Sequence, residues 1–192
     1  MGAPETMVRM GELAASSASG HVLVSLGLGS CIGLALLDRR MSIAGLAHIV
    51  LPEAVGPELD NPRKFANHAV PELVSELEGL GARKVRLEAV LVGGASMFAV
   101  SAASLEVGQR NEAAVREELR TLRIPVRAAA TGGKRGRTVR VDVATAGVTV
   151  REAGGKDEQL VAGTPARSAV PAPDGHSTAT ADSPRECGAA VA

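Results

Sequence analysis

The feature of this sequence that most constrains its fold is the run Ile32–Leu37, which carries no polar side chain. A short apolar run without polar alternation is typical of a β-strand that is covered on both faces. The fold must therefore supply one layer on each side of this strand. The chain contains only two Phe and no Trp or Tyr, so Val, Leu, Ile and Ala have to fill both interfaces.

Further strands are predicted where short β-rich or alternating segments end at Gly, Pro or polar turns. These strands cover residues 7–14, 21–26, 42–50, 84–92 and 125–130, with a hairpin over 138–143 and 148–151. We expect the last two segments to pair across a turn at residues 144–147. The many short strands place the chain among proteins dominated by β-sheet layers.

Two segments carry apolar residues at helical spacing. The first is predicted to begin at Asn61-Pro62, because Asn caps free backbone N–H groups and Pro fits the first helical turn. It should end at Gly81, and Pro71 should either kink it or mark a later start. The second covers residues 111–122. Hairpins combined with two amphipathic helices predict an α+β fold: a compact single domain of mixed, largely antiparallel β-sheet layers.

The composition changes after about residue 154. Residues 155–192 are rich in Ala, Gly, Pro, Ser and Thr, and contain no aromatic residue. Such a segment cannot bury enough apolar surface to offset its ordering entropy, so we expect a disordered tail that includes Cys187. The predicted organisation is a flexible N-terminus over residues 1–6, one domain over 7–154, and this tail.

Charge and cysteine content exclude several classes of function. The formal net charge is zero, which gives no basic footprint for nucleic-acid binding. No apolar run is long enough to span a membrane, and no C-x-x-C pattern indicates a zinc site or a disulfide framework. We therefore expect no metal, no cofactor, no membrane insertion and a reducing cytoplasm. The segment GLGSCIG also fails the dinucleotide fingerprint, because Ile32 stands where glycine is required.

Cys31 lies in this glycine-rich segment, between Ser30 and Ile32. Free cysteine is one of the most buried residue types, and packing as a small hydrophobe is the simpler interpretation of this position alone. The alternative is a nucleophile at a tight turn, where backbone N–H groups near Gly29 and Ser30 hold an oxyanion. The segment by itself favours packing.

His48 strengthens the alternative. It is the only polar residue between Ser42 and Glu53, and an imidazole among apolar side chains needs a partner. That partner is either a backbone carbonyl or the thiol of Cys31, 17 residues earlier. This separation suits one strand and its antiparallel return, so the two side chains could meet and the imidazole could lower the pKa of the thiol.

Ser25 is the third candidate, because its hydroxyl could orient His48 from the preceding predicted strand. A strand serine taken alone is far more often structural than catalytic. The remaining histidines are His21 at a strand start, His68 on a helix and His176 in the tail. Each is most simply interpreted as solvated.

These residues lie in motifs that resemble the CheD family of chemoreceptor glutamine deamidases in bacterial chemotaxis. The similar segments appear in order over about residues 7–152: LGLGSCIGLALLD, AGLAHIVLPEA, KFANHAVPELVSELEGLGA, EAVLVGGASMF, VGQRN and IPVRAAATGGKRGRTVRVD. Several ordered motifs are far more specific than any one of them.

The resemblance implies a compact fold similar to the catalytic domain of deamidating bacterial toxins. It assigns Cys31 as the nucleophile, His48 as the base and Ser25 to the position where the family usually has threonine. It also places Phe65 where the family often has tyrosine. Gly29 and Ser30 are then expected to position the substrate and its oxyanion.

The resemblance further implies the reaction and the partners. The expected enzyme is a protein-glutamine glutaminase that converts glutamine side chains on cytoplasmic chemoreceptor helices to glutamate and releases ammonia. Glutamates produced in this way serve as methylation sites. A CheC-type phosphatase is the second expected partner, and some family members also act as receptor methylesterases.

Other functions stay open at this stage. The chain could be a non-catalytic regulator of a CheC-type phosphatase, or a redox sensor that uses Cys31 alone. A papain-like protease is disfavoured, because the local signature of that family is missing. A basic cluster, Lys134, Arg135, Arg137 and Arg140, is interpreted first as a solvated hairpin face and second as a docking site for acidic receptor helices.

Overall fold

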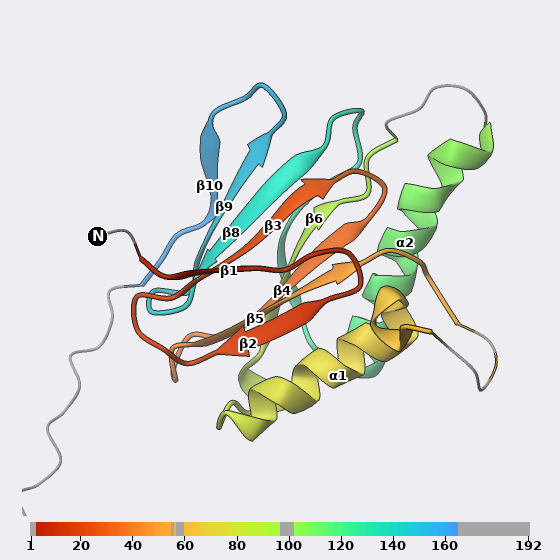
Figure 1. Ribbon diagram of the computed structural model, residues 1–192. Coiled ribbons are helices and arrows are strands. Elements are labelled where there is room, and N and C mark those ends of the chain that lie inside the picture. Colours follow the sequence, from red (N-terminus) through yellow and green to blue (C-terminus); the bar gives the residue numbers. More distant parts are fainter. Residues whose placement is uncertain (1–2, 55, 57–59, 97–101, 165–192) are drawn as a thin grey trace, which may run out of the picture.

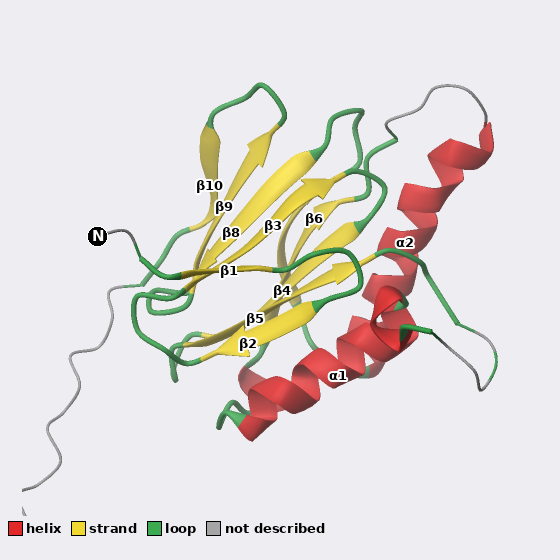
Figure 2. Ribbon diagram, in the orientation of Figure 1, coloured by secondary structure: helices red, strands yellow, loops and turns green. Residues whose placement is uncertain are grey.

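The structure is a computed structural model that describes residues 3–54, 56, 60–96 and 102–164. Two five-stranded sheets pack face to face, and both long helices cover the outer face of one of them (Figure 1). Figure 2 shows this segregation, with the helices gathered on one side of the strands. The layers are therefore sheet, sheet and helices.

The first sheet has the strand order β1-β3-β8-β9-β10, and the second has the order β2-β5-β4-β6-β7. Their bounds are β1 Glu5–Met7, β2 Leu13–Ser16, β3 Val22–Leu28, β4 Ile32–Asp38, β5 Ile43–Ile49, β6 Glu88–Gly93, β7 Val126–Thr131, β8 Arg137–Asp142, β9 Gly147–Glu152 and β10 Asp157–Val161. All pairings are antiparallel except β1 with β3 and β6 with β7. The predicted α+β class with largely antiparallel sheets is confirmed.

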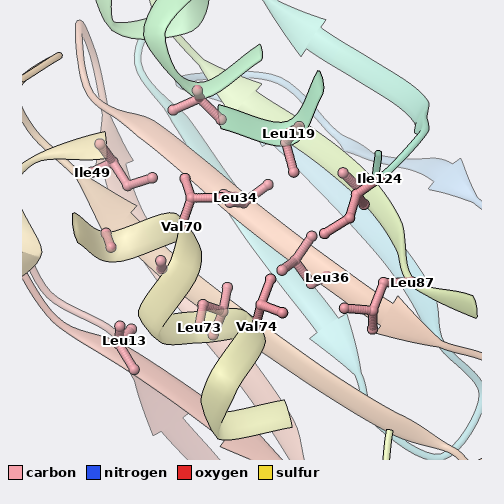
Figure 3. Packing of buried hydrophobic residues seen from close by; sticks show 14 of the residues in the cluster. Leu13, Leu34, Leu36, Ile49, Val70, Leu73, Val74, Leu87, Leu119 and Ile124 are labelled. Atoms are coloured by element: carbon pink, nitrogen blue, oxygen red, sulfur yellow. The ribbon is translucent and has the colours of Figure 1, made fainter. Parts of the chain in front are cut away.

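Strand β4 lies at the centre of the second sheet, and every residue in it is buried. Its side chains alternate between two cores: Leu34 and Leu36 face the helices, whereas Ala35 and Leu37 face the other sheet. Figure 3 shows Leu34 and Leu36 packed beneath the helices. The prediction of a strand covered on both faces is confirmed.

Helix α1, Ala66–Gly79, begins later than predicted. The Asn61 side chain accepts a hydrogen bond from the Arg63 N–H at 3.0 Å, but it caps a short 3₁₀ helix, Pro62–Lys64. The α-helix itself starts after Phe65 and runs through Pro71. The predicted apolar stripe packs on β4, and the helix stops before Gly81 as expected.

Two other boundaries differ from the prediction. Helix α2, Ala102–Thr121, starts nine residues earlier than expected. The segment predicted as a strand from residue 84 opens with a 3₁₀ helix, Lys84–Arg86, and strand β6 starts at Glu88. The alternation that suggested a strand was misleading, because Val85 is 84% exposed and its apolar side chain faces solvent.

Both predicted ends of the domain were placed too far inward. Residues 5 and 6 are not a loose N-terminus, since β1 pairs with β3, and the predicted strand over 7–14 is divided between β1 and β2. Residues 157–161 form β10, which pairs with β9 and buries Val161. A polar edge strand needs few apolar residues, so composition alone did not reveal it. Residues 165–192, with Cys187, lie outside the described residues.

No helix among the described residues is both long enough and apolar enough to cross a membrane.

Candidate active site

Strands β4 and β5 bring Cys31 and His48 to the same side of the second sheet. Gly33 lies directly opposite His48 in the antiparallel register, and Cys31 is two residues before Gly33. Side chains two residues apart share a face, so Cys31 and His48 are diagonal neighbours across the strand pair. Both face the first sheet, because Cys31 belongs to the core between the sheets.

Gly33 keeps the space beside these residues open. A Cβ atom at this position would lie 2.7 Å from Leu28 Cδ1 and 3.3 Å from Val139 Cγ1 of the facing sheet. A side chain here would therefore collide with the first sheet where the thiol and the imidazole share one face. The glycine allows the two sheets to approach closely at this point.

Ser25 reaches His48 from the opposite sheet. It lies on β3 and is completely buried, and its Oγ is 2.9 Å from His48 Nδ1. The same hydroxyl donates to the Val8 carbonyl oxygen, also at 2.9 Å. Because a serine hydroxyl carries one proton, it must accept at its other contact, so Nδ1 carries the imidazole proton. The chain thus fixes the His48 tautomer.

This tautomer leaves His48 Nε2 as a lone-pair acceptor. Among the described residues, Nε2 has no hydrogen-bond partner, although His48 is only 2% exposed. Burial lowers the pKa of His48, an effect partly opposed by the Val8 carbonyl and by the charge of Glu12. The imidazole is therefore neutral near pH 7 and ready to accept a proton at Nε2.

Cys31 is buried, with 9% of the residue exposed, and lies directly before β4. Burial raises the pKa of the thiol, while the backbone N–H of Cys31 itself lowers it. The expectation that His48 would lower this pKa is therefore wrong for the resting protein, because desolvation dominates and the imidazole is neutral. In the resting protein both the thiol and the imidazole are therefore neutral near pH 7.

Three consecutive carbonyl oxygens hold the loop before β4. Gly29 O accepts from the Ala95 N–H at 2.7 Å, and Cys31 O accepts from the Gly94 N–H at 2.8 Å. Between them, Ser30 O accepts from the Asn111 side-chain amide at 2.9 Å. The predicted substrate-positioning residues Gly29 and Ser30 thus lie in a loop whose peptide planes are fixed.

The glycine pair after β6 makes this arrangement possible. Gly93 and Gly94 have φ values of +114° and +63°, and a Cβ on Gly93 would lie 2.2 Å from Cys31 O. Both glycines adopt backbone conformations that other residues rarely adopt, and the absence of a side chain at Gly93 leaves room for the carbonyl of Cys31. The second predicted glycine turn, Gly132-Gly133, also has positive φ at both positions.

Asn111 was missed as a site residue by the sequence analysis, which used it only as the start of a helix. Its side chain is fully buried, and Nδ2 donates to both Ser30 O and Val50 O at 2.9 Å. The available signal was a polar residue on the buried stripe of α2, four residues before Val115 and in line with Leu119.

The predicted basic cluster is not one surface. Arg137 is 8% exposed and donates to Gly132 O at 2.6 Å and to Glu152 Oε1 at 2.7 Å, so its assignment to a solvated or docking face was wrong. Arg140 pairs with Glu5 on β1. Lys134 and Arg135 are exposed on the turn before β8. A guanidinium among carbonyl oxygens is stabilised inside the fold, which charge patterning cannot reveal.

The other histidines lie elsewhere. His21 was predicted to be solvated, but it is half-buried, with Nδ1 2.8 Å from Ser16 Oγ and Nε2 2.9 Å from Thr6 Oγ1. These bonds link β1 and β2 to the start of β3. His68 is half-buried on α1, and His176 lies outside the described residues.

Within the described part of the chain, no group of three or more His, Cys, Asp and Glu side chains is arranged to hold a metal ion.

Comparisons with known proteins agree with the sequence motifs. A family model described as CheD chemotactic sensory transduction matches residues 50–152. A Clostridium kluyveri protein named "Probable chemoreceptor glutamine deamidase CheD" is 44% identical over 142 residues, covering 72% of this chain and 88% of the relative. A Clostridium botulinum protein of the same name is 46% identical over 135 residues, covering 69% of this chain and 83% of the relative.

One solved structure is similar at low identity. It is Neisseria meningitidis protein NMB0706, with a TM-score of 0.44 and 11% sequence identity. The match covers 69% of this chain and 64% of that one, just under two thirds of its length.

Proposed function

This chain belongs to the CheD family of chemoreceptor glutamine deamidases, and we propose that Cys31, His48 and Ser25 carry out its reaction. The protein is a protein-glutamine glutaminase: it hydrolyses glutamine side chains of chemoreceptors to glutamate and releases ammonia. The proposal concerns the residues that perform this chemistry and the partners that they meet.

The observation that carries the proposal is that His48 Nε2 has no hydrogen-bond partner in the part of the chain that the structure describes. A buried polar atom without a hydrogen bond is unfavourable by about 1–3 kcal/mol, so it needs a reason. Here the opposite ring nitrogen is fixed by Ser25, and the only described free thiol lies on the same face. Proton transfer from Cys31 to His48 supplies that reason.

Acylation begins when His48 Nε2 takes the proton of the Cys31 thiol and the sulfur attacks the amide carbon of glutamine. The C–S bond forms, and the carbonyl oxygen becomes an oxyanion that the N–H groups of Ser30 and Cys31 stabilise. The imidazolium then gives its proton to the amide nitrogen. The C–N bond breaks, ammonia leaves, and a thioester remains on Cys31.

Deacylation uses the same groups with water as the nucleophile. His48 Nε2 takes a proton from water, and the oxygen adds to the thioester carbon. When the C–S bond breaks, the sulfur recovers its proton from His48. The product is glutamate, and the enzyme returns to the neutral pair. One water is consumed and one ammonia is released for each glutamine.

Ser25 holds the imidazole in the productive tautomer throughout. Its contacts to Val8 and His48 use only the hydroxyl group, which serine shares with the threonine usual in the family. The missing methyl leaves the side-chain rotamer less restrained. Complete burial on β3 compensates, because the surrounding core leaves the hydroxyl little room to turn.

The proposal also includes where and with what the enzyme works. We expect it to act in the cytoplasm on chemoreceptor helices, without binding nucleic acid. A CheC-type phosphatase is the second proposed partner, based on the family resemblance alone. Co-purification of this chain with such a phosphatase from the same organism would test that part independently of catalysis.

The deciding experiment incubates the purified protein with a chemoreceptor cytoplasmic fragment that carries glutamine at its modification sites. Mass spectrometry follows the conversion of glutamine to glutamate. We expect Cys31→Ala to reduce the rate by at least about 10³-fold, as removal of a nucleophile usually does. Its melting temperature should stay within about 4 °C of wild type.

The matched control is Cys187→Ala, which removes the other cysteine and should deamidate at the wild-type rate. Equal product from wild type and Cys31→Ala would contradict the nucleophile assignment. Absence of conversion by the wild-type protein would contradict the proposed function itself.

A further inference from the structure

We propose that Asn111 on α2 is a positioning residue that aims the backbone N–H of Cys31 at the oxyanion of the reaction. This inference rests on the proposed function and adds a residue that no comparison assigns. It starts from the contacts of the Asn111 side chain, which joins helix α2 to the ends of both strands that carry the reacting groups.

The contacts of Asn111 are both to carbonyl oxygens. Nδ2 donates one proton to Ser30 O, directly before Cys31, and the other to Val50 O, directly after β5, each at 2.9 Å. Val50 follows His48 by two residues on the partner strand. Both donors of one fully buried amide therefore clamp the ends of β4 and β5 together at the site.

The hydrogen bond from Asn111 to Ser30 O also sets the direction of the Cys31 N–H, because both groups belong to one planar peptide. In a trans peptide, the carbonyl of one residue and the N–H of the next point in opposite directions. All described peptide bonds are trans. Because Asn111 holds the carbonyl of Ser30, the Cys31 N–H has to point away from α2. That N–H lies against the sulfur of its own residue and lowers the thiol pKa.

The neighbouring peptide is held in the same manner. Gly29 O accepts from the Ala95 N–H at 2.7 Å, which sets the direction of the Ser30 N–H. The N–H of Ser30 is thus fixed by backbone, whereas the N–H of Cys31 is fixed by one side chain. A substitution at Asn111 can therefore disturb the Cys31 N–H as an oxyanion donor while every residue of the loop itself stays unchanged.

Buried polar atoms without a hydrogen-bond partner also lie at the proposed site. Within the described residues, only two buried side-chain nitrogen or oxygen atoms lack a hydrogen-bond partner: His48 Nε2 and Asn111 Oδ1. A buried residue selected for stability alone would satisfy both ends of its amide. Asn111 instead leaves its acceptor unpaired and commits both donors to the two strand ends of the site.

The test compares two reactions of the same thiol. Deamidation passes through an oxyanion, whereas alkylation of Cys31 by iodoacetamide displaces iodide at carbon and forms no oxyanion. We expect Asn111→Leu to lower kcat for the receptor fragment by about 10- to 100-fold, somewhat less than loss of a direct oxyanion donor. KM should change less than about threefold. The limiting alkylation rate, reached at a pH where the thiol is fully ionised and the rate no longer depends on the thiol pKa, should change about twofold or less.

Two further variants keep the result interpretable. Asn111→Asp has the shape of asparagine but loses at least one hydrogen-bond donor. If Asn111→Leu does not fold, this variant serves in its place: its deamidation rate should fall while its alkylation rate stays nearly unchanged. Val115→Ala removes buried volume one turn further along α2, so it should lower the melting temperature without changing kcat.

Each outcome is decisive. A wild-type kcat in a folded Asn111 variant would overturn the inference, as would deamidation and alkylation rates that fall together, since the latter indicates general loosening of the site. Failure of the Asn111 variants alone leaves the deamidase function standing. A wild-type protein without deamidase activity removes both conclusions.

Discussion

The buried polar groups at the two ends of strand β4 differ in their hydrogen bonding. At one end, Asp38 is completely buried, and its carboxylate accepts hydrogen bonds from the Arg86 side chain at 2.6 Å and from the Arg83 N–H at 3.1 Å. At the other end, Cys31 and His48 lie on one face, and His48 Nε2 has no partner among the described residues.

The pKa shifts follow this difference. Burial alone would raise the pKa of Asp38, but the hydrogen bonds and the charge of Arg86 hold it below its usual value. Burial dominates at the other end, so the pKa of Cys31 is raised and that of His48 is lowered. The Asp38 end is charged and fully bonded, and it stabilises the fold. The Cys31 end is neutral and incompletely bonded, which suits proton transfer.

The largest expected effect is on activity at the Cys31 end. His48→Gln removes the proton acceptor and keeps a side chain that can bond to Ser25, so kcat should fall by about 10²- to 10⁴-fold. The free energy of unfolding should change by less than about 1 kcal/mol, because Nε2 makes no hydrogen bond to any described residue. Ammonia release and urea denaturation measure the two quantities. If the variant is active but strongly destabilised, His48 stabilises the fold and does not take part in catalysis, which would contradict the role given to this end of β4.

The complementary change at the Asp38 end is Asp38→Ala. It leaves the N–H of Arg83 and the guanidinium of Arg86 without their acceptor, so the free energy of unfolding should fall by about 2–3 kcal/mol. The activity of each folded molecule should not change. Because the folded pKa of Asp38 is lowered, this stabilisation is present above its unfolded pKa and disappears as the pH falls through the folded value. Denaturation curves at several pH values would check this.

Ser25→Ala should have a smaller effect on activity. It removes the acceptor of the His48 Nδ1 proton, so both tautomers become populated, and kcat should fall by about 10- to 100-fold. Ser25→Thr restores the family residue, and we expect its kcat to lie within about threefold of wild type. If Ser25→Ala is as active as wild type, the tautomer is held by something other than this hydroxyl.

The smallest effect is a displacement of the pH profile. A lowered pKa keeps His48 in its proton-accepting form to lower pH, so the acid limb of kcat/KM should have its midpoint below about 6.5. The raised pKa of Cys31 means that its alkylation rate should still increase beyond pH 9. A plateau of alkylation near pH 7 would instead indicate a thiolate–imidazolium pair and contradict the neutral resting state.

Residues with a local signature were predicted well from the sequence. The unbroken apolar run Ile32–Leu37 indicated a strand between two layers. The isolated His48 indicated an imidazole that needs a hydrogen-bond partner, and the hydroxyl of Ser25 is such a partner. The glycines at 93 and 94 indicated a backbone that needs conformational freedom, and both have positive φ. Each of these predictions depends on burial, period or backbone freedom, which are properties of a few neighbouring residues.

The remaining features could not be derived in this way. Val8 and Asn111 reach the site from a loop and a helix far away in the sequence, and the polar strand β10 is held by its neighbour β9. The protonation of the resting pair was also predicted incorrectly, since proximity suggested a low thiol pKa and burial raises it.

The sequence by itself thus determined the central strand and the fold class, because the hydrophobic pattern lies along the chain. Its family motifs also indicated the residues that we propose to react. Only the tertiary structure decided which nitrogen of His48 is free and which peptide N–H faces the sulfur. Those properties depend on hydrogen bonds to Val8, Ser25 and Asn111, whose partners become neighbours only when the sheets and helix pack.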